Sequence, residues 1–288
     1  MGYIFIVLSA LSYCIMSIFV KLAGEQLATI QIVFVRGVIT LLVTYLILLK
    51  KGIKPLGKNR DVLMIRGLVG SIALFLVYES LQRLSLSEAT VIQYLYPIFT
   101  ALFAGLILSE HISKKIFFSI IFGLIGVYVI LDFPILNIGD APRMDIIISL
   151  SGAILTGLSY VMVKKASNLK ESPYVIMFYF PLFTVPLSML FLNDNWVMPS
   201  TLIWVYLIMV GISSQFGQIF LTYGYELLPA SKAAITSYLQ VPFSVIAGII
   251  IFKDVITPNF IFGTTIILFT ILMMIKRDKV NNLEKKLF

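Results

Sequence analysis

The sequence predicts an all-α membrane protein of ten transmembrane helices, arranged as two inverted repeats of five. Apolar residues make up 59% of the 288 residues and charged residues only 12%, with a mean hydropathy of +1.00. Soluble domains carry about 25% charged residues, so this composition cannot supply a water-exposed surface. Long apolar runs recur along the whole chain, and the second half repeats the pattern of the first. These two features together predict the fold class.

Each spanning helix needs about 20 mostly apolar residues, because an α-helix rises about 1.5 Å per residue. Helices are expected because lipid offers no partners to open strand edges. The first run has no basic segment before it, so we expect it to remain as a span rather than be cleaved as a signal peptide. The expected spans are 3–20, 30–49, 62–81, 87–109, 116–132, 146–164, 173–192, 201–223, 230–252 and 259–276.

The distribution of basic residues predicts that both termini are cytoplasmic. With ten spans and the N-terminus inside, the cytoplasmic segments hold sixteen of the 22 Lys and Arg residues and the outer loops hold four, while Arg36 and Arg66 lie within spans. Basic residues favour the cytoplasmic side of a membrane. The net charge of +8 is therefore a topology signal, and we expect no nucleic-acid partner.

The two halves share a repeated segment. Residues 89–110 read ATVIQYLYPIFTALFAGLILSE, and residues 233–254, 144 positions later, read AAITSYLQVPFSVIAGIIIFKD. We expect one repeat in residues 1–141 and a second in 142–288, which ends in a short basic tail. Because five spans is an odd number, the second repeat enters the membrane upside down. Inverted repeats of this kind are typical of transporters, with the solute site near the midplane between the halves.

Several motifs carry a family resemblance. With the two five-span halves, they resemble the EamA branch of the drug/metabolite transporter superfamily over about residues 3–276. The second half departs from the pattern, since its proline falls one place late and Lys-Asp replaces the commoner Gly-Glu. The motifs are Phe34-x-Arg36, Leu81-Gln82-Arg83-Leu84-Ser85, Tyr96-Pro97 and Ser109-Glu110, then Glu226-Leu227-Leu228-Pro229-Ala230-Ser231, Val241-Pro242 and Lys253-Asp254.

The resemblance implies a carrier in the cytoplasmic membrane that moves a small organic solute by alternating access. Such solutes are amino acids, vitamins such as riboflavin, or related metabolites, and the alternative is efflux of toxic organic compounds. The expected partners are this solute and membrane lipid, for a chain that is a monomer or a homodimer. No cofactor or metal is expected, because the chain has one cysteine, Cys14, and one histidine, His111.

An enzyme is disfavoured because no nucleophile–base pair or ligand cluster is evident. A channel is disfavoured because the polar residues are scattered and form no continuous path. The chain also lacks a P-loop for ATP. Exchange, facilitated diffusion and proton coupling all remain open as ways to drive transport.

Polar residues within spans are the candidate solute-binding residues, because burying them in lipid is costly without a partner or a role. Gln93, Tyr96 and Thr100 share one stripe of the fourth span, and Gln240 and Ser244 follow the matching stripe of the ninth. Close helix packing is the alternative explanation for both stripes. Further candidates are Tyr78, Tyr160, Gln215 and Gln218.

Two charged residues within spans form a candidate ion pair. Arg36 and Glu79 are expected at a similar depth from the outer surface, within reach of a salt bridge. The pair could act as an outer gate, or Arg36 could anchor a carboxylate on the solute. The structural alternatives are a static pair, or an arginine that extends its side chain to the lipid headgroups.

Prolines and acids complete the repeated segment. Pro97 and Pro242 each remove a backbone donor near mid-span, so we expect a kink in both helices that helps to open a central cavity. Glu110 and Asp254 end the two segments and are expected to stabilise the start of the helix that follows, beside Ser113 and Thr257-Pro258.

Overall fold

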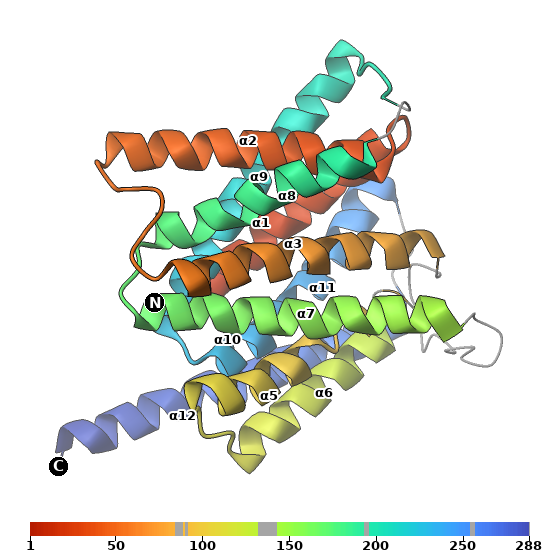
Figure 1. Ribbon diagram of the computed structural model, residues 1–288. Coiled ribbons are helices and arrows are strands. Elements are labelled where there is room, and N and C mark those ends of the chain that lie inside the picture. The colour runs from red at the N-terminus through yellow and green to blue at the C-terminus, as the bar shows by residue number, and fades with distance from the viewer. Residues whose placement is uncertain (84–88, 90–91, 132–142, 193–195, 254–256, 288) are drawn as a thin grey trace.

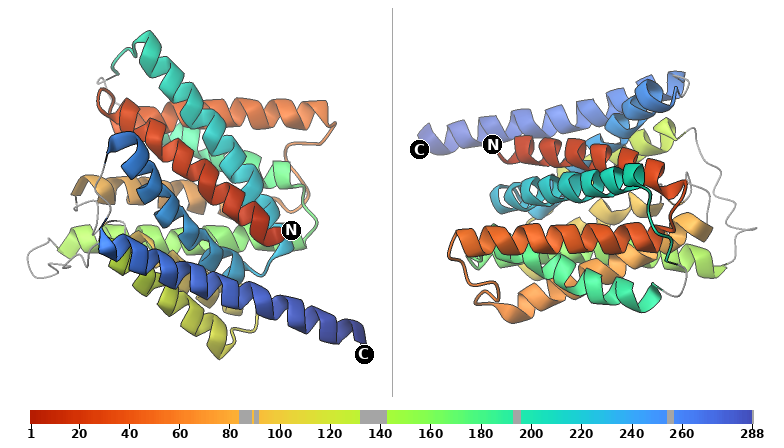
Figure 2. Two further views of the ribbon diagram at one scale, coloured as in Figure 1. Left: turned by 180° about the vertical axis from the view of Figure 1, so that it is seen from behind. Right: turned by 90° about the horizontal axis from the view of Figure 1, so that it is seen from above.

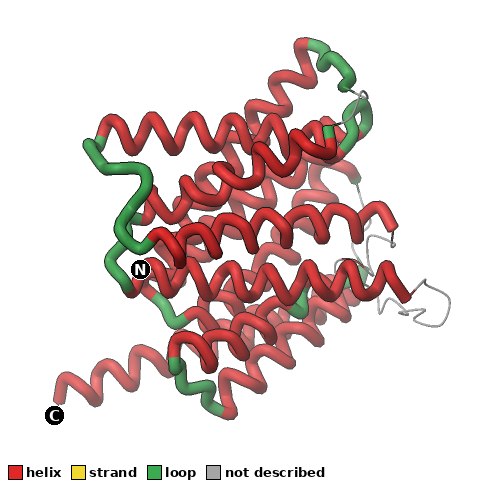
Figure 3. Tube along the Cα trace, viewed as in Figure 1, coloured by secondary structure: helices red, strands yellow, loops and turns green. Residues whose placement is uncertain are grey.

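The structure is a bundle of helices (Figures 1 and 3). A computed structural model describes residues 1–288 except 84–88, 90–91, 132–142, 193–195, 254–256 and 288, and this described part contains no strand. Its helices are α1 (Gly2–Gly24), α2 (Thr29–Lys50), α3 (Arg60–Arg83), α5 (Tyr96–Leu108), α6 (Lys114–Ile130), α7 (Arg143–Asn168), α8 (Pro173–Phe191), α9 (Thr201–Leu227), α10 (Ala230–Thr236), α11 (Gln240–Ala247) and α12 (Pro258–Leu287), with a 3₁₀ turn at Ser237–Leu239 and a π-helical turn at Gly248–Phe252.

Seven described helical segments are long and apolar enough to cross a membrane. They correspond to α1, α2, α3, α7, α8 and α9 and to the continuous run Ala230–Ile251, and two shorter apolar helices are Tyr96–Leu108 and Pro258–Met273. Large apolar side chains such as Leu46, Leu106 and Phe122 are exposed on the outside of the bundle. Such a surface suits lipid, so the chain is a multi-pass membrane protein.

Helix α12 is longer than the sequence predicted. The expected span ended at residue 276 with a short tail, whereas the helix continues to Leu287. It projects beyond the other helices at its C-terminal end (Figures 1 and 2).

Helices α5 and α11 show that the repeat extends to local backbone geometry. Helix α5 begins at Tyr96, and α11 begins 144 residues later at Gln240. The residues that end the two matching stretches, Ser109 and Lys253, are also 144 apart, and both have left-handed backbones with φ of 54° and 59°. Non-glycine residues rarely adopt this conformation. Its recurrence at matched positions therefore reflects the same turn built twice.

Packing between the helices follows the same relation. Helix α1 packs along α9, and α7 packs along α3, while α2 lies against α8 and α6 against α12. In the repeat, α1 corresponds to α7, α2 to α8, α3 to α9 and α6 to α12. If each helix is replaced by its counterpart, the α1–α9 contact becomes the α7–α3 contact, and the α2–α8 and α6–α12 contacts stay the same. Two related halves joined about a two-fold axis produce this pattern.

The two helical segments that contain Pro97 and Pro242 are both interrupted. Residues Tyr94 and Leu95 form a turn before α5, which places Pro97 in the first turn of that helix. The 3₁₀ turn at Ser237–Leu239 likewise precedes α11, which contains Pro242. Proline is tolerated in a first helical turn because its missing N–H would have no partner there. The break in each helix therefore lies just before the proline.

Glu110 stabilises a different helix from the one expected. Its carboxylate accepts hydrogen bonds from the backbone N–H groups of Ala230 (2.8 Å) and Ser231 (3.5 Å) at the start of α10. Helix α6, the next in sequence, is capped instead by Ser113, whose hydroxyl accepts from the N–H of Ile116. A carboxylate at a helix N-terminus is favourable wherever it comes from. Glu110 thus links the two halves, while Asp254 lies outside the described residues.

The connections at one end of the bundle are tied together. Both chain ends and the α2–α3, α5–α6 and α7–α8 connections lie at this end (Figures 1 and 2). The Glu171 carboxylate, between α7 and α8, accepts from the backbone N–H groups of Lys58 (2.8 Å) and Asn59 (2.5 Å) and from the Asn59 side chain (2.8 Å). Burial alone would raise the pKa of Glu171, but these hydrogen bonds outweigh it and lower that pKa.

We expect Glu171→Ala to lower the free energy of unfolding at neutral pH by about 1–3 kcal/mol, because three donors lose their charged acceptor. A lowered native pKa means that the stabilisation is present above the ordinary carboxyl pKa of about 4.3 and is lost as the pH falls through the native value. Thermal unfolding of wild type and variant in detergent should therefore differ at pH 7 and converge near pH 3.

Glu25→Ala is the matched control, because Glu25 is an exposed carboxylate at the end of α1. It should shift stability by less than about 0.5 kcal/mol. An unfolding difference between wild type and Glu171→Ala that stayed constant with pH would contradict the charged interaction.

Candidate binding site between the two halves

Two arginines meet at one aromatic ring inside the bundle. The guanidinium carbon of Arg66 lies 4.9 Å from the centroid of Phe180, and that of Arg36 lies 6.0 Å from the same centroid. Arg36 on α2 and Arg66 on α3 belong to the first half, while Phe180 on α8 belongs to the second. Their side chains are buried, with only 6% and 2% of Arg36 and Arg66 exposed. Arginine stacks well on aromatic faces, so Phe180 supports both cations.

Arg66 is held by residues of the second half. Its Nη1 donates to the Ser159 hydroxyl on α7 (2.9 Å), and its Nη2 donates to the Gln218 side chain on α9 (3.5 Å). Its Nε is buried and has no hydrogen-bond partner in the described part of the chain. Gly70, one turn along α3, leaves room for the guanidinium, because a Cβ there would collide with Nη1 of Arg66.

Arg36 is held by α9. Its Nε donates to the Ser214 hydroxyl at 2.7 Å. The next residue, Gln215, accepts from Thr44 of α2 (3.1 Å), and its amide nitrogen is buried without a partner. These contacts place Arg36 on the inside of the bundle, against α9.

The expected ion pair between Arg36 and Glu79 is wrong. Glu79 pairs instead with Arg83 on the next turn of α3 at 2.7 Å, and Arg83 also reaches Asp145 of α7 at 3.3 Å. A pair one helical turn apart forms more easily than one between separate helices, since the connecting backbone already fixes its geometry. Arg36 therefore remains free to face the centre.

No described carboxylate neutralises the two central arginines. The salt bridges that arginines form with described carboxylates within 4.0 Å both involve Arg83. Two described acids are buried, and both have partners of their own. Asp145 accepts from Arg83, and Glu171 accepts from the α2–α3 connection. The centre of the bundle consequently holds two positive charges whose hydrogen-bond partners are all neutral.

A chain of tyrosines leads from Arg66 to the broken helices. Tyr225 and Tyr160 are 5.3 Å apart between ring centroids, and Tyr160 meets Tyr96 edge-on at 5.5 Å. Tyr94 follows at 6.2 Å from Tyr96, and it lies 5.9 Å from Tyr238 of the second half. Tyr160 and Tyr225, together with Tyr13 of α1, are also close enough to Arg66 to interact with its charge. The site therefore combines cations, hydroxyl groups and aromatic faces.

The structure brings some predicted site residues to this centre. Gln218 accepts a hydrogen bond from Arg66, and Tyr160 lies close to the same guanidinium group. Tyr96 packs edge-on against Tyr160. Gln93 borders the cluster, donating to Thr156 on α7 at 3.3 Å while its buried amide oxygen has no described partner.

Other predicted residues lie elsewhere. Thr100 is fully buried and donates to the Tyr96 carbonyl, where α5 packs closely on Gly157. Its position fits the packing alternative. Ser244 and Gln240 are half-buried on α11, with Ser244 near the Cys14 thiol, and Tyr78 is half-buried near the far end of α3.

The sequence prediction missed the residues that organise the centre. Arg66 had one available signal, since it is a charge inside an apolar span. Ser159 and Ser214 had none, because a single serine in a span is as often a packing residue. Phe180 had none either, because a phenylalanine in a membrane helix is unremarkable by itself. The functional relation among them exists only after the helices pack.

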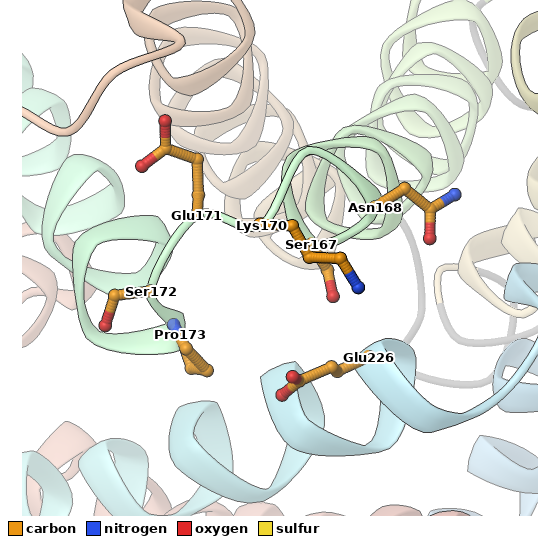
Figure 4. Close-up of a pocket in the computed structure, with 7 residues that line it drawn as sticks. All are labelled: Ser167, Asn168, Lys170, Glu171, Ser172, Pro173 and Glu226. Carbon is orange, nitrogen blue, oxygen red and sulfur yellow. The ribbon is translucent and has the colours of Figure 1, made fainter.

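A separate polar pocket of about 420 Å³ opens at the end of the bundle that carries the chain ends. It is lined by Lys170, Glu171 and Glu226 among others, and Figure 4 shows Glu226 approaching it from α9 across from the α7–α8 connection. None of the residues that line it belongs to the arginine centre.

The fold and this centre define a class: polytopic helical membrane proteins with a buried polar site between two similar halves. The chain belongs to the EamA-like transporter family, whose model matches it twice, at residues 1–132 and 143–276. The resemblance seen in the sequence motifs is thereby confirmed.

Relatives with names fit the same class. The chain is 25% identical to the pseudopaline exporter of Pseudomonas aeruginosa, covering 88% of each protein. It is 30% identical to solute carrier family 35 member G1 of Mus musculus, covering 89% of this chain and 73% of the relative. It is 25% identical to the S-adenosylmethionine uptake transporter of Rickettsia prowazekii, covering 96% and 93%. A solved crystal structure with a TM-score of 0.82, at 17% identity, covers 95% of this chain and 96% of the other and shares its fold. The general role of the chain is transport.

We expect Gly70→Ala to destabilise the protein by about 1–3 kcal/mol, the usual cost of overpacking a core. The added methyl would displace Arg66 from Ser159 and Phe180. Gly105→Ala on α5 is the control, because its Cβ would meet nothing closer than 3.7 Å, and it should gain up to about 1 kcal/mol of helix propensity. Thermal unfolding of both variants in detergent measures the difference. Equal stability of the two variants would show that Arg66 is not held in this position.

Proposed function

We propose that the protein is a secondary carrier that moves a small organic solute across the cytoplasmic membrane by alternating access, with the solute bound at the centre between the two halves. The observation that carries this proposal is the buried polar cluster built from both halves: Arg36 and Arg66 from the first, and Ser159, Phe180 and Gln218 from the second. Polar groups at such depth are costly unless they serve a ligand or a pathway.

The construction of the site suits alternating access. Each arginine lies on a helix of one half and is held by side chains of the other. A rocking motion of one half against the other would therefore change the surroundings of both cations at once. The interrupted helices beside Pro97 and Pro242 supply backbone that can adjust during this motion. The relatives include both an exporter and an uptake transporter, as expected for a fold whose two states are exchanged versions of each other.

We also propose the ten-span topology, with repeats in residues 1–141 and 142–288 and both termini in the cytoplasm. The double match to the family model supports two repeats. The chain ends and the basic α2–α3 and α7–α8 connections share one end of the bundle (Figure 2). Clustered Lys and Arg favour the cytoplasmic side.

Transport is tested with the purified protein in liposomes, using labelled succinate, S-adenosylmethionine, riboflavin and a mixture of amino acids as probes. We expect saturable uptake of at least one probe, accelerated when the same unlabelled compound is preloaded inside, because a carrier returns faster when loaded. Gln218→Leu should reduce this exchange at least tenfold, and Gln26→Leu, at an exposed position, should leave it unchanged. Uptake that rises linearly with concentration and shows no exchange would indicate a channel.

Orientation is tested by labelling single cysteines in a Cys14→Ala background. Glu25→Cys and Lys54→Cys place exposed thiols in the α1–α2 and α2–α3 connections, at opposite ends of the bundle. We expect a membrane-impermeant maleimide to label the first in intact cells and the second only after permeabilisation. The reverse pattern would place both termini outside.

A further inference from the structure

We infer, building on the proposed carrier function, that the transported solute is an organic dianion whose two acidic groups pair with Arg36 and Arg66. Both guanidinium groups face Phe180 from inside the bundle. The solute would place one acidic group at each guanidinium and lay its connecting carbons along the aromatic ring.

The two central arginines lack a counter-charge among the described residues. Arginine stays protonated in proteins, so each of these residues carries a full positive charge. Burying a charge without a counter-charge costs several kcal/mol. Among the described residues, the only carboxylates within 4.0 Å of an arginine are those that pair with Arg83. A ligand with two negative charges would neutralise the centre, a monoanion would leave one charge unpaired, and a cation would be repelled.

Hydrogen-bonding capacity points the same way. The buried Nε of Arg66 and the buried amide nitrogen of Gln215 are donors without partners in the described residues, and the Tyr225 hydroxyl is likewise buried and unpaired. The side chains that accept from the arginines, Ser159, Gln218 and Ser214, are already in place. The centre thus has surplus donors, which suit the several acceptor oxygens of carboxylate or phosphate groups.

The distances of the two arginines from Phe180 place an upper limit on the size of the solute. Because both distances end at the Phe180 centroid, the two guanidinium carbons lie within the sum of those distances, about 11 Å, of each other. A carboxylate paired with a guanidinium through two N–H···O bonds places its carbon roughly 4 Å from the guanidinium carbon. For a solute that lies between the two guanidinium groups, the two acidic carbons are therefore at most a few ångströms apart, which favours a short dicarboxylate such as succinate.

The experiment compares compounds that share a carbon skeleton and differ in charge: succinate, succinamate and succinamide, with the matching adipate series for length. A ligand that binds the native state raises its thermal midpoint with concentration. For purified wild-type protein we expect one dianion to bind at least tenfold more tightly than its monoamide, which corresponds to about 1.4 kcal/mol, and the diamides to produce no shift.

Variants assign the effect to the two arginines. Arg36→Gln and Arg66→Gln should each reduce the preference for dianion over monoamide to about one, because only one cation remains. Arg66→Lys should keep part of the preference. Arg83→Gln is the matched control, since Arg83 is an arginine outside the centre that pairs with Glu79 and Asp145, and it should retain the full preference. Circular dichroism of each variant without ligand reports whether the variant remains folded. If only one of the two Arg→Gln variants folds, its preference for dianion over monoamide can still be compared with that of the wild type.

The outcomes separate this inference from the carrier function. Four results would overturn the proposal of a dianionic solute. The dianion, monoamide and diamide could give equal shifts, or none of them could give a shift. Inorganic phosphate alone could give a shift, or both Arg→Gln variants could keep the wild-type preference. Saturable exchange of a neutral or cationic probe by the wild type would also overturn this proposal while the carrier function stood. A dianion that stabilised the protein in this charge order and was never exchanged across liposomes would support the binding site and contradict the carrier.

Discussion

The arrangement of the whole centre depends on two positive charges that share one aromatic ring in a low-dielectric interior. The guanidinium groups of Arg36 and Arg66 both lie near the Phe180 ring, and neutral hydroxyl and amide groups hold them. Charge attraction at such depth is strong because little water screens it. The cost of keeping both cations buried must be met by packing elsewhere in the bundle, and glycines such as Gly70 make that close packing possible.

The two halves are similar in backbone but carry different side chains at this place. Thr40 donates to the carbonyl of Arg36, and Thr184, 144 residues later, donates to the carbonyl of Phe180. Arg36 and Phe180 therefore occupy equivalent positions in the repeat, and the ring of one half receives the cation of the other. The repeat gives two halves that can move in equivalent ways, while the difference in side chains gives a centre with a defined charge.

Contacts at the ends of the bundle restrain the same halves. Glu110 of the first half holds the start of α10 in the second, and Glu171 of the second holds the α2–α3 connection of the first. Each is a carboxylate that accepts backbone N–H groups, so it fixes a connection without needing a cation. Both contacts lie at the end of the bundle that carries the chain ends (Figure 1). A carrier that opens toward this end would have to loosen them.

The sequence alone determined the membrane class, the helical fold and the family, because apolar composition, helix length and local motifs are properties of neighbouring residues. It also indicated where the helices beside Pro97 and Pro242 break. Only the tertiary structure decided the partners of the charged side chains. Glu79 pairs within its own helix, Glu110 reaches α10, and Arg36 bonds to Ser214, 178 residues away. Such partners depend on how helices rotate and approach each other, and hydropathy carries no information about that rotation. Apolar residues mark which segments enter the lipid, whereas the packed bundle decides which polar side chains meet.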